Sequence, residues 1–471
     1  MSLPFTIAET ASALRDGSIT SVEVVERGIA RAQALDAELG VFINRFDEQA
    51  LEAAAKADEE LAAGVDHGPL HGIPLGIKDN IAAAEGPTTA QSMAIDPAWG
   101  DGKDAIVIER LKRSGAIVAG KLSTMEFACG MPDPERPFPL PRNPWDVDRW
   151  PGGSSSGTGA GVAAGLFLAG LGTDTAGSIR MPASFCGVSG LKPTYGRVPN
   201  AGSVPLGYSM DHIGPLARSA QDCWLVLEAI AGPDPRDADA VDRSLPAPPP
   251  LDGSLNGLRI GIEREHHLGL EPEDPAAVPV FEQAVEALES LGATVTEVSL
   301  PLYQEALVAG LVTFLSEGLA YHHPDLAERP DHYAPSNRAL FSMGASFSGA
   351  DYVQSQRVRR AAQRALAAVF SDLDAIVMPA ATVAAPSYDQ LMTGSTLRVL
   401  GGVHTLYWDA VGNPALVVPM GFTAERMPLS LQLAAPPFAE DVLVRIGDAY
   451  QRLTDWHLQV PPLAQEAAGI A

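Results

Sequence analysis

The spacing of hydrophobic residues near the start of the chain predicts helices. Four of them recur three or four residues apart, as along one face of a helix. The dipeptide Thr20-Ser21 precedes this run and offers a helix N-cap. A second helix, rich in Ala and Glu, is predicted over residues 48–63. We interpret residues 6–63 as a helical arm that packs on the body of the protein. The first helical face consists of Val22, Val25, Ile29 and Ala32.

Beyond the arm, the hydrophobic pattern predicts strands that alternate with helices. Ile73, Leu75 and Ile77 alternate as in a strand, which turns Lys78 to the opposite face, beside Gly76. The alternation of the two element types continues to the end of the chain and indicates a layered α/β fold. Further strands are predicted at residues 116–119, 258–262, 294–298, 375–378, 415–419 and 429–433, and helices at 104–115, 281–291 and 436–451.

Two further segments have a distinct composition. Residues 232–257 are rich in Pro and Asp, and we expect a surface loop there rather than a domain boundary. Residues 303–370 are predicted to be helical and to lie near the substrate pocket. Five prolines between Pro132 and Pro141 deny that segment regular structure.

The segment from residue 151 to 187 consists mainly of Gly, Ala, Ser and Thr, with Asp174 and Arg180 its only charges. A flexible surface linker has a similar composition. However, Leu166, Phe167 and Leu168 lie between its two glycine loops and favour burial. Small residues let one backbone approach another, or approach a ligand. We therefore expect a buried site shaped by glycine.

The same residues resemble the signature of the amidase signature family, serine hydrolases with a Ser–cis-Ser–Lys triad. The match runs without a gap over residues 152–183, and the resemblance extends over roughly residues 8–455. It implies one large α/β/α domain over residues 1–471, with a mixed central β-sheet covered by helices. Residues 71–222 would form the catalytic core.

The resemblance also assigns catalytic residues. Ser178 is the expected nucleophile, and an alcohol needs a base beside it. No histidine has a motif context that nominates it, and the HExxH spacing of zinc hydrolases is absent. The family's base corresponds to Lys78, within GIPLGIKD. Its bridging serine corresponds to Ser154, with a cis peptide bond. Lys78 must then be neutral, which requires burial.

Further site residues follow from the same resemblance. The turn formed by Thr175, Ala176, Gly177 and Ser178 would direct backbone N–H groups at the oxyanion. Asp174 is expected to brace that turn. Arg180 either binds a substrate carboxylate or is structural. Candidate substrate contacts are Met125, Trp150, Arg180 and Tyr208, with a packing role as the alternative for Trp150.

Composition and net charge argue against some classes of function. Hydrophobic residues make up 46% and charged ones 19%, which is typical of a globular protein. The net charge of −26 argues against nucleic-acid or anionic-membrane binding. Three cysteines without CxxC spacing, Cys129, Cys186 and Cys223, fit a reducing compartment. We see neither a secretory signal nor a membrane-spanning run, so we expect a cytoplasmic protein.

Three functions remain to be compared. The first is an amidohydrolase that cleaves a small-molecule amide, ester or carbamate without cofactor or metal, with a homodimer left open. The second is the amidase subunit of a tRNA-dependent amidotransferase, which frees ammonia from glutamine. That branch usually carries a segment like EASSNLARYDG, whereas residues 316–323 read SEGLAYHH. The third, a phosphate-binding protein, lacks the GK[ST] ending of a P-loop. We expect the first function.

Overall fold

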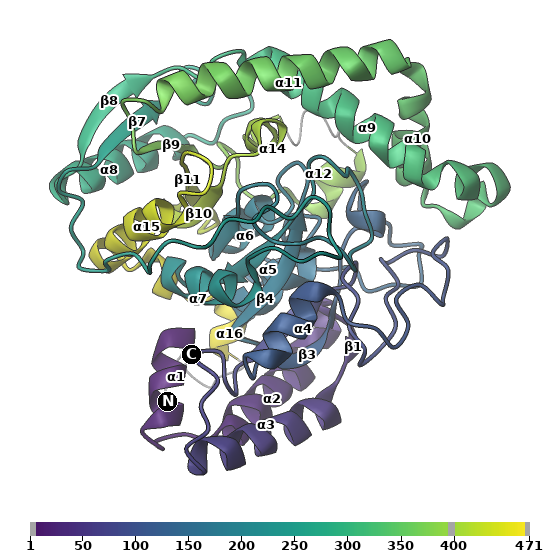
Figure 1. Ribbon diagram of the computed structural model, residues 1–471, viewed down its shortest axis with the longest axis vertical. Coiled ribbons are helices and arrows are strands. Elements are labelled where there is room, and N and C mark those ends of the chain that lie inside the picture. Colours follow the sequence, from purple (N-terminus) through teal and green to yellow (C-terminus); the bar gives the residue numbers. More distant parts are fainter. Residues whose placement is uncertain (1–5, 394–400, 467–471) are drawn as a thin grey trace.

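A single mixed sheet of eleven strands runs through the protein in the computed structural model, which describes residues 6–393 and 401–466. The strand order is β1-β3-β2-β4-β6-β5-β10-β11-β9-β7-β8 (Figure 1). β2 pairs in parallel with both β3 and β4, and β7 pairs in parallel with both β8 and β9. In the middle of the sheet, the pairs β4–β6, β5–β10 and β10–β11 are antiparallel. The strands are β1 Phe42–Arg45, β2 Pro74–Lys78, β3 Ile117–Leu122, β4 Ala169–Asp174, β5 Ser189–Lys192, β6 His212–Ala217, β7 Arg259–Glu263, β8 Thr294–Val298, β9 Ala375–Pro379, β10 Ala415–Phe422 and β11 Pro428–Ala434.

Helices cover both faces of this sheet, which confirms the predicted α/β/α architecture. Successive residues of a strand point to opposite faces. Leu416 and Val418 of β10 accordingly pack into a cluster with α7, α8 and α15, whereas Val417 packs with residues of α5 and α6. The helices are α1 Ile7–Arg15, α2 Ser21–Leu39, α3 Asp47–Ala62, α4 Ile106–Arg113, α5 Ser156–Ala164, α6 Arg180–Cys186, α7 Ala220–Ile230, α8 Ala277–Ser290, α9 Tyr303–Glu328, α10 Pro335–Met343, α11 Gly349–Val369, α12 Tyr388–Thr393, α14 Leu406–Val411, α15 Glu440–Thr454 and α16 Pro462–Glu466.

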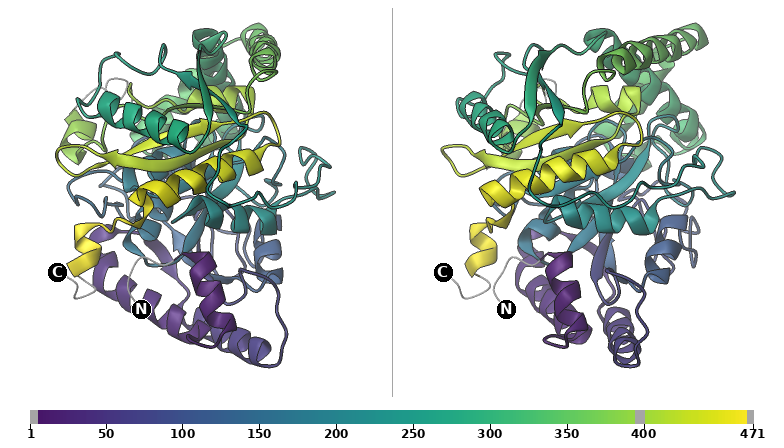
Figure 2. Two further views of the ribbon diagram at one scale, coloured as in Figure 1. Left: turned by 90° about the vertical axis from the view of Figure 1, so that its left-hand side faces the viewer. Right: turned by 60° about the vertical axis from the view of Figure 1, so that its left-hand side comes forward.

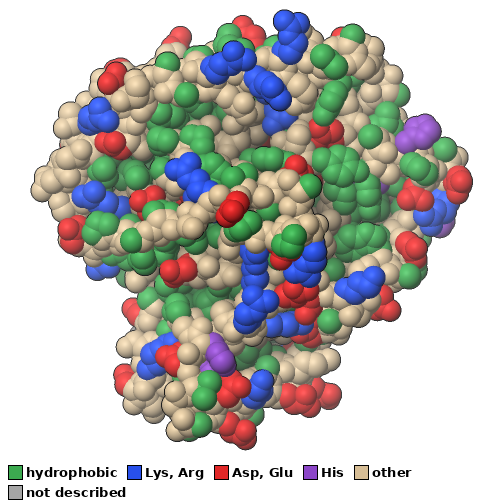
Figure 3. Space-filling model, viewed as in Figure 1, with side chains coloured by type: hydrophobic (Ala, Val, Ile, Leu, Met, Phe, Trp, Pro, Cys, Tyr) green, Lys and Arg blue, Asp and Glu red, His purple; other side chains and the backbone are tan. Residues whose placement is uncertain are grey.

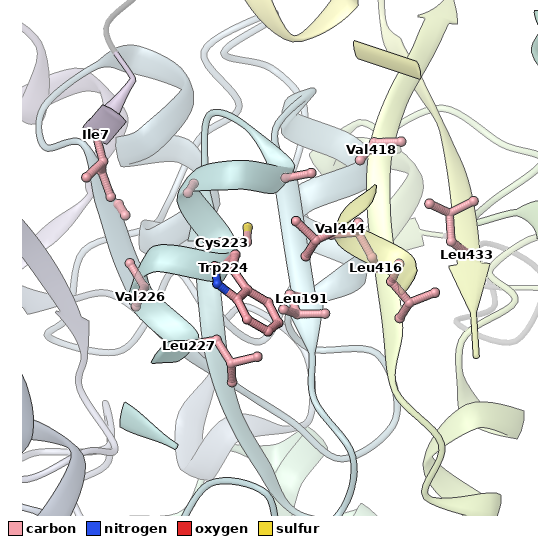
Figure 4. Packing of buried hydrophobic residues seen from close by; sticks show 14 of the residues in the cluster. Ile7, Leu191, Cys223, Trp224, Val226, Leu227, Leu416, Val418, Leu433 and Val444 are labelled. Atoms are coloured by element: carbon pink, nitrogen blue, oxygen red, sulfur yellow. The ribbon is translucent and has the colours of Figure 1, made fainter. Parts of the chain in front are cut away.

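The main hydrophobic core lies between the sheet and the helices α7, α8 and α15. Figure 4 shows Trp224 of α7 beside Leu191 of β5 and Leu416 of β10. Ile7 of α1 belongs to the same cluster, as do residues of β2 and β7. This core therefore joins the beginning, the middle and the end of the chain.

The N-terminal helices lie at one end of the molecule and the long helices α9 and α11 at the other (Figures 1 and 2). Thr6 and Thr20 cap α1 and α2 as capping boxes, in agreement with the predicted cap before α2. The arm also contributes β1, which pairs with β3 at the edge of the sheet and was not predicted. Residues 232–257 carry no helix or strand. No described helix is long and apolar enough to cross a membrane.

Charged side chains of both signs lie on the surface. Figure 3 shows acidic and basic side chains scattered over the face that is viewed in Figure 1, with hydrophobic side chains between them. On this face, therefore, acidic and basic side chains are mixed, and no single region of it is uniformly acidic.

Candidate active site

Lys78 ends β2 in the interior of the protein, with no exposed surface. Its Nζ lies 2.7 Å from Ser154 Oγ and 2.7 Å from Thr173 Oγ1. Burial lowers the pKa of Lys78 to about 7, against a smaller opposing effect of Asp174. A substantial fraction of this lysine is therefore neutral near pH 7, as a base that accepts a proton must be.

Ser154 follows a cis peptide bond between Gly153 and Ser154, at the position that the resemblance implies. Its carbonyl oxygen accepts hydrogen bonds from Thr124 Oγ1 at 2.9 Å and from the Met125 N–H at 3.3 Å. A Cβ atom on Gly153 would lie 2.2 Å from Met125 Sδ. The glycine therefore lets the serine loop pack directly against the segment around Met125.

Ser178 lies in the turn between β4 and α6, half-buried, so its side chain remains accessible. The Ser155 N–H donates to the Ser178 carbonyl oxygen at 3.2 Å, which joins the two serine-bearing loops. Gly177, just before Ser178, has a φ of 127°. A side chain at that position would be strained, so the turn depends on glycine.

Asp174 braces this turn, as predicted from the sequence. Its carboxylate accepts the Gly177 N–H at 2.6 Å and the Ile179 N–H at 3.0 Å. Because the Gly177 N–H is already engaged, three N–H groups of the predicted oxyanion turn remain, those of Thr175, Ala176 and Ser178. Within the described residues these three donate no hydrogen bond. They are the groups that could bind an oxyanion.

Arg180 is fully buried, and its guanidinium is occupied by protein groups. It forms an ion pair with Asp174 and another with Asp409 of α14, and it donates to the Thr405 carbonyl oxygen at 2.8 Å and to Gln432 at 3.0 Å. Burial alone would raise the pKa of Asp174, but Arg180 holds it below its usual range. These contacts fit the structural alternative for Arg180, and a substrate contact by this residue stays a prediction.

The other predicted substrate contacts lie in different surroundings. Trp150 is 1% exposed and packs edge-on against Phe185, so the packing alternative fits. Met125 is buried against Gly153, beside the serine loop. Tyr208 is 48% exposed and lines a cavity of about 260 Å³, together with Thr173 and Thr175. For Met125 and Tyr208 a substrate contact stays a prediction.

Two polar residues beside Lys78 were not predicted. Thr173 Oγ1 accepts hydrogen bonds from Lys78 Nζ and from Asn80 Nδ2, the latter at 3.1 Å. Asn80 lies in the turn that follows β2, where the Ile81 N–H donates to the Lys78 carbonyl oxygen at 3.0 Å, so the sequence indicated only that Asn80 is two residues from Lys78. Thr173 gave no such signal, because its approach to Lys78 depends on the parallel pairing of β2 with β4.

Comparisons with known proteins show what this chain is similar to. The family model described as Amidase matches residues 23–444. A glutamyl-tRNA(Gln) amidotransferase subunit of Chloroflexus aggregans is 40% identical over 98% of each chain. The solved peptide amidase of Stenotrophomonas maltophilia is 30% identical, with a TM-score of 0.83 over 97% of this chain and 98% of its own.

A third similar structure is described as an unexpected vestigial protein complex that reveals the origins of an s-triazine catabolic enzyme. It is 33% identical, with a TM-score of 0.88 over 96% of this chain and 99% of its own.

These relatives correct the expected partners. We predicted a small-molecule amide and no nucleic acid, but the curated relatives are subunits of an enzyme named for glutamyl-tRNA(Gln). The prediction was wrong because it rested on net charge, which is an average over one chain and does not show what an assembly of several chains binds. The signature, the fold and the matching model nevertheless agree on the family: this chain belongs to the amidase signature family.

Proposed function

We propose that the chain is the amidase subunit of a tRNA-dependent amidotransferase, in which Ser178 releases ammonia from an amide donor such as glutamine. The observation that carries this proposal is the 40% identity to the glutamyl-tRNA(Gln) amidotransferase subunit of Chloroflexus aggregans over nearly the whole of both chains. The contact between Lys78 and Ser154 in a buried site supports the amide-cleaving step.

The first step is the attack of Ser178 Oγ on the amide carbon. The hydroxyl proton passes to Ser154, whose own proton passes to the neutral amine of Lys78 at 2.7 Å. A C–O bond forms, and the amide oxygen becomes an oxyanion. The free N–H groups of Thr175, Ala176 and Ser178 would donate to it, and each such donor is worth about 2.7–4 kcal/mol in comparable enzymes.

The second step breaks the C–N bond. Lys78 returns its proton through Ser154 to the leaving nitrogen, so that neutral ammonia departs and Ser178 carries the acyl group. Water then attacks the ester carbon and loses its proton to the same relay, which yields the carboxylic acid and restores Ser178. In this cycle the pKa of Lys78, about 7, suits both proton acceptance and proton return.

The segment SEGLAYHH is the main departure from the amidotransferase pattern. It belongs to α9, where Glu317 accepts hydrogen bonds from Ser209 Oγ at 2.8 Å and from Tyr352 Oη at 2.6 Å. His322 is buried between Phe127 and Phe341. The segment therefore packs against Phe127 and, through Glu317, contacts Ser209, the residue after Tyr208, so a change there can alter the surroundings of Tyr208 without removing the proposed triad.

Ammonia release from glutamine tests the proposal. The wild-type chain is assayed alone, with candidate partner subunits, and with those subunits and glutamyl-tRNA(Gln). We expect release that requires Ser178 and Lys78 and that rises when the partners and the charged tRNA are present. Loss of activity in Ser178→Ala with an unchanged assembly is the matched control.

One outcome would overturn the proposal. If no partner subunit associates with the chain, and the chain alone cleaves other amides in a Ser178-dependent manner, the amidotransferase assignment fails while the triad chemistry stands.

A further inference from the structure

Three metal-binding side chains converge at the junction between the N-terminal arm and the sheet. Glu60 lies in the last turn of α3, and His67 and His71 lie in the loop that leads into β2. One ligand atom from each lies within 4.8 Å of the other two. The catalytic residues described above do not include any of them.

We propose that Glu60, His67 and His71 bind a divalent transition-metal ion of the zinc class. Imidazole nitrogen and carboxylate oxygen are the ligands that such ions take at about 2.0–2.2 Å. Two ligands at that distance in a tetrahedral site lie about 3.3 Å apart. His71 Nε2 and Glu60 Oε2 are 3.0 Å apart, and His67 Nε2 and Glu60 Oε2 are 3.5 Å apart. Two of the three pairs of ligand atoms are therefore already about as far apart as a tetrahedral site requires.

The third pair, a ring nitrogen of His67 and one of His71, reaches the same separation through a small movement of His67. The two imidazole rings lie 4.7 Å apart between centroids, at an angle of 52°. His67 is 39% exposed, so its side chain can rotate, whereas His71 has no exposed surface and is held in place. A rigid histidine and an adjustable one suit a site that takes its ion from solvent.

The ring proton of His71 must change its position when a metal ion binds. The His67 N–H donates to His71 Nδ1 at 3.2 Å, so the ring proton is on Nε2, which faces Glu60. Metal binding at Nε2 requires the proton on Nδ1, so the contact with the His67 N–H must open as His67 moves, and Asp66 Oδ1, now 4.0 Å from Nδ1, would have to approach to accept that proton. A ligating histidine whose other nitrogen donates to a carboxylate is the common arrangement in metal sites.

An ion can reach these three side chains from a neighbouring cavity, which also has room for water as a further ligand. A cavity of about 260 Å³ is lined by Glu60, His67 and His71. Lys56, 3.4 Å from Glu60 Oε1, is 74% exposed and can move away from an incoming cation. Water from the cavity would complete four-coordination. Because the ligands join the end of α3 to the turn before β2, the ion would bind the arm to the sheet.

Zinc binding to tag-free protein tests the proposal. Protein treated with EDTA and then freed of it is titrated with ZnCl₂ by calorimetry, and Co²⁺ absorption reports the geometry. We expect one equivalent of Zn²⁺, bound at least tenfold more weakly in His67→Ala and in Glu60→Gln. The exposed His323 of α9 provides the matched control, His323→Ala, which should bind as the wild type does.

A melting experiment separates lost binding from lost folding. Zn²⁺ should raise the melting temperature of the wild type and of His323→Ala, but not that of His67→Ala. The metal-free proteins should melt together, since His67 is exposed and its removal leaves the contact between Glu60 and His71. The proposal is overturned if the wild type binds no Zn²⁺, or if His67→Ala and Glu60→Gln bind it as tightly as the wild type does.

Discussion

Lys78, the proposed base, lies in an environment that shifts its pKa. Its burial disfavours the ammonium form, so its pKa lies near 7 rather than at its ordinary value above 10. Below pH 7 the protonated amine cannot accept the proton of Ser154. We therefore predict that fluorophosphonate labelling of Ser178 slows about tenfold per pH unit below pH 6 and reaches a plateau above pH 8. Intact-mass measurement of the adduct over time gives the rate.

Two variants serve as controls for this pH profile. Ser178→Ala should form no adduct at any pH. Lys78→Ala should label about 10²–10⁴ times more slowly than the wild type and lose the inflection near pH 7, because the titrating base is gone. A wild-type rate that does not change between pH 6 and pH 8 would contradict the assignment of Lys78 as the base.

Thr173 positions that base. Its hydroxyl oxygen accepts a hydrogen bond from Lys78 Nζ, which directs the amine toward Ser154. We predict that Thr173→Val, which replaces the hydroxyl with a methyl group, lowers the labelling rate about tenfold or more, while Thr173→Ser retains it. The pH at which the labelling rate of Thr173→Val changes should also differ from that of the wild type, because Lys78 loses a hydrogen-bond partner. If Thr173→Val and Thr173→Ser had the same labelling rate and the same pH profile, the hydroxyl group of Thr173 would not position Lys78, and the residue would contribute only to packing.

At the scale of elements, local patterns predicted most of the strands and helices. The strand predicted at 294–298 has the observed bounds, and the strand predicted at 116–119 is β3, which extends to Leu122. β1, β4, β5 and β6 were missed. β1 is a short edge strand whose pairing with β3 compensates for a weak local pattern. β6 is buried on both faces between β4 and β5, and such a strand lacks the alternation that marks a half-exposed one.

The turn between β4 and α6 depends on one glycine. Gly177 has a φ of 127°, and a Cβ there would lie 2.1 Å from Thr405 Oγ1, the atom that donates to the Ala176 carbonyl oxygen at 2.6 Å. We predict that Gly177→Ala displaces this turn and lowers the labelling rate about a hundredfold. Backbone strain should also lower the free energy of unfolding by about 1–3 kcal/mol.

Gly349, the first residue of α11, is the matched control for Gly177. A Cβ there meets no atom within 4 Å, and its φ is not positive. Gly349→Ala should keep the wild-type labelling rate and leave the free energy of unfolding unchanged or slightly raised, because alanine favours helix by about 0.5–1 kcal/mol. Similar rates in Gly177→Ala and Gly349→Ala would contradict the role given to the turn.

At the scale of the whole molecule, the candidate site is assembled from distant segments. The three residues proposed as the triad could be named from the sequence because each lies in a motif, and the structure places two of them, Lys78 and Ser154, 2.7 Å apart. The pairing of Arg180 with Asp409 of α14 and Gln432 of β11 could not be predicted, because it depends on how the signature packs against the C-terminal part of the sheet. That packing fits the structural alternative for Arg180.

The main core also bears on the prediction of a single domain. Leu75 of β2 and Leu433 of β11 lie far apart in the sheet, yet they belong to one contiguous cluster of buried side chains. If that cluster folds as one unit, unfolding in urea should give one transition that coincides by circular dichroism and by tryptophan fluorescence. Leu75→Ala and Leu433→Ala should each move the whole transition to lower urea, by about 2–5 kcal/mol in free energy of unfolding.

Val353→Ala on α11 is the control for these core variants, because Val353 is 59% exposed and its truncation leaves no cavity. It should change the free energy of unfolding by no more than about 0.5 kcal/mol. Two separate transitions, of which Leu75→Ala moves one and Leu433→Ala the other, would instead show two units that unfold independently. In that case the contacts of Arg180 with Asp409 and Gln432 would join two units, and the stability of the site would depend on their interface.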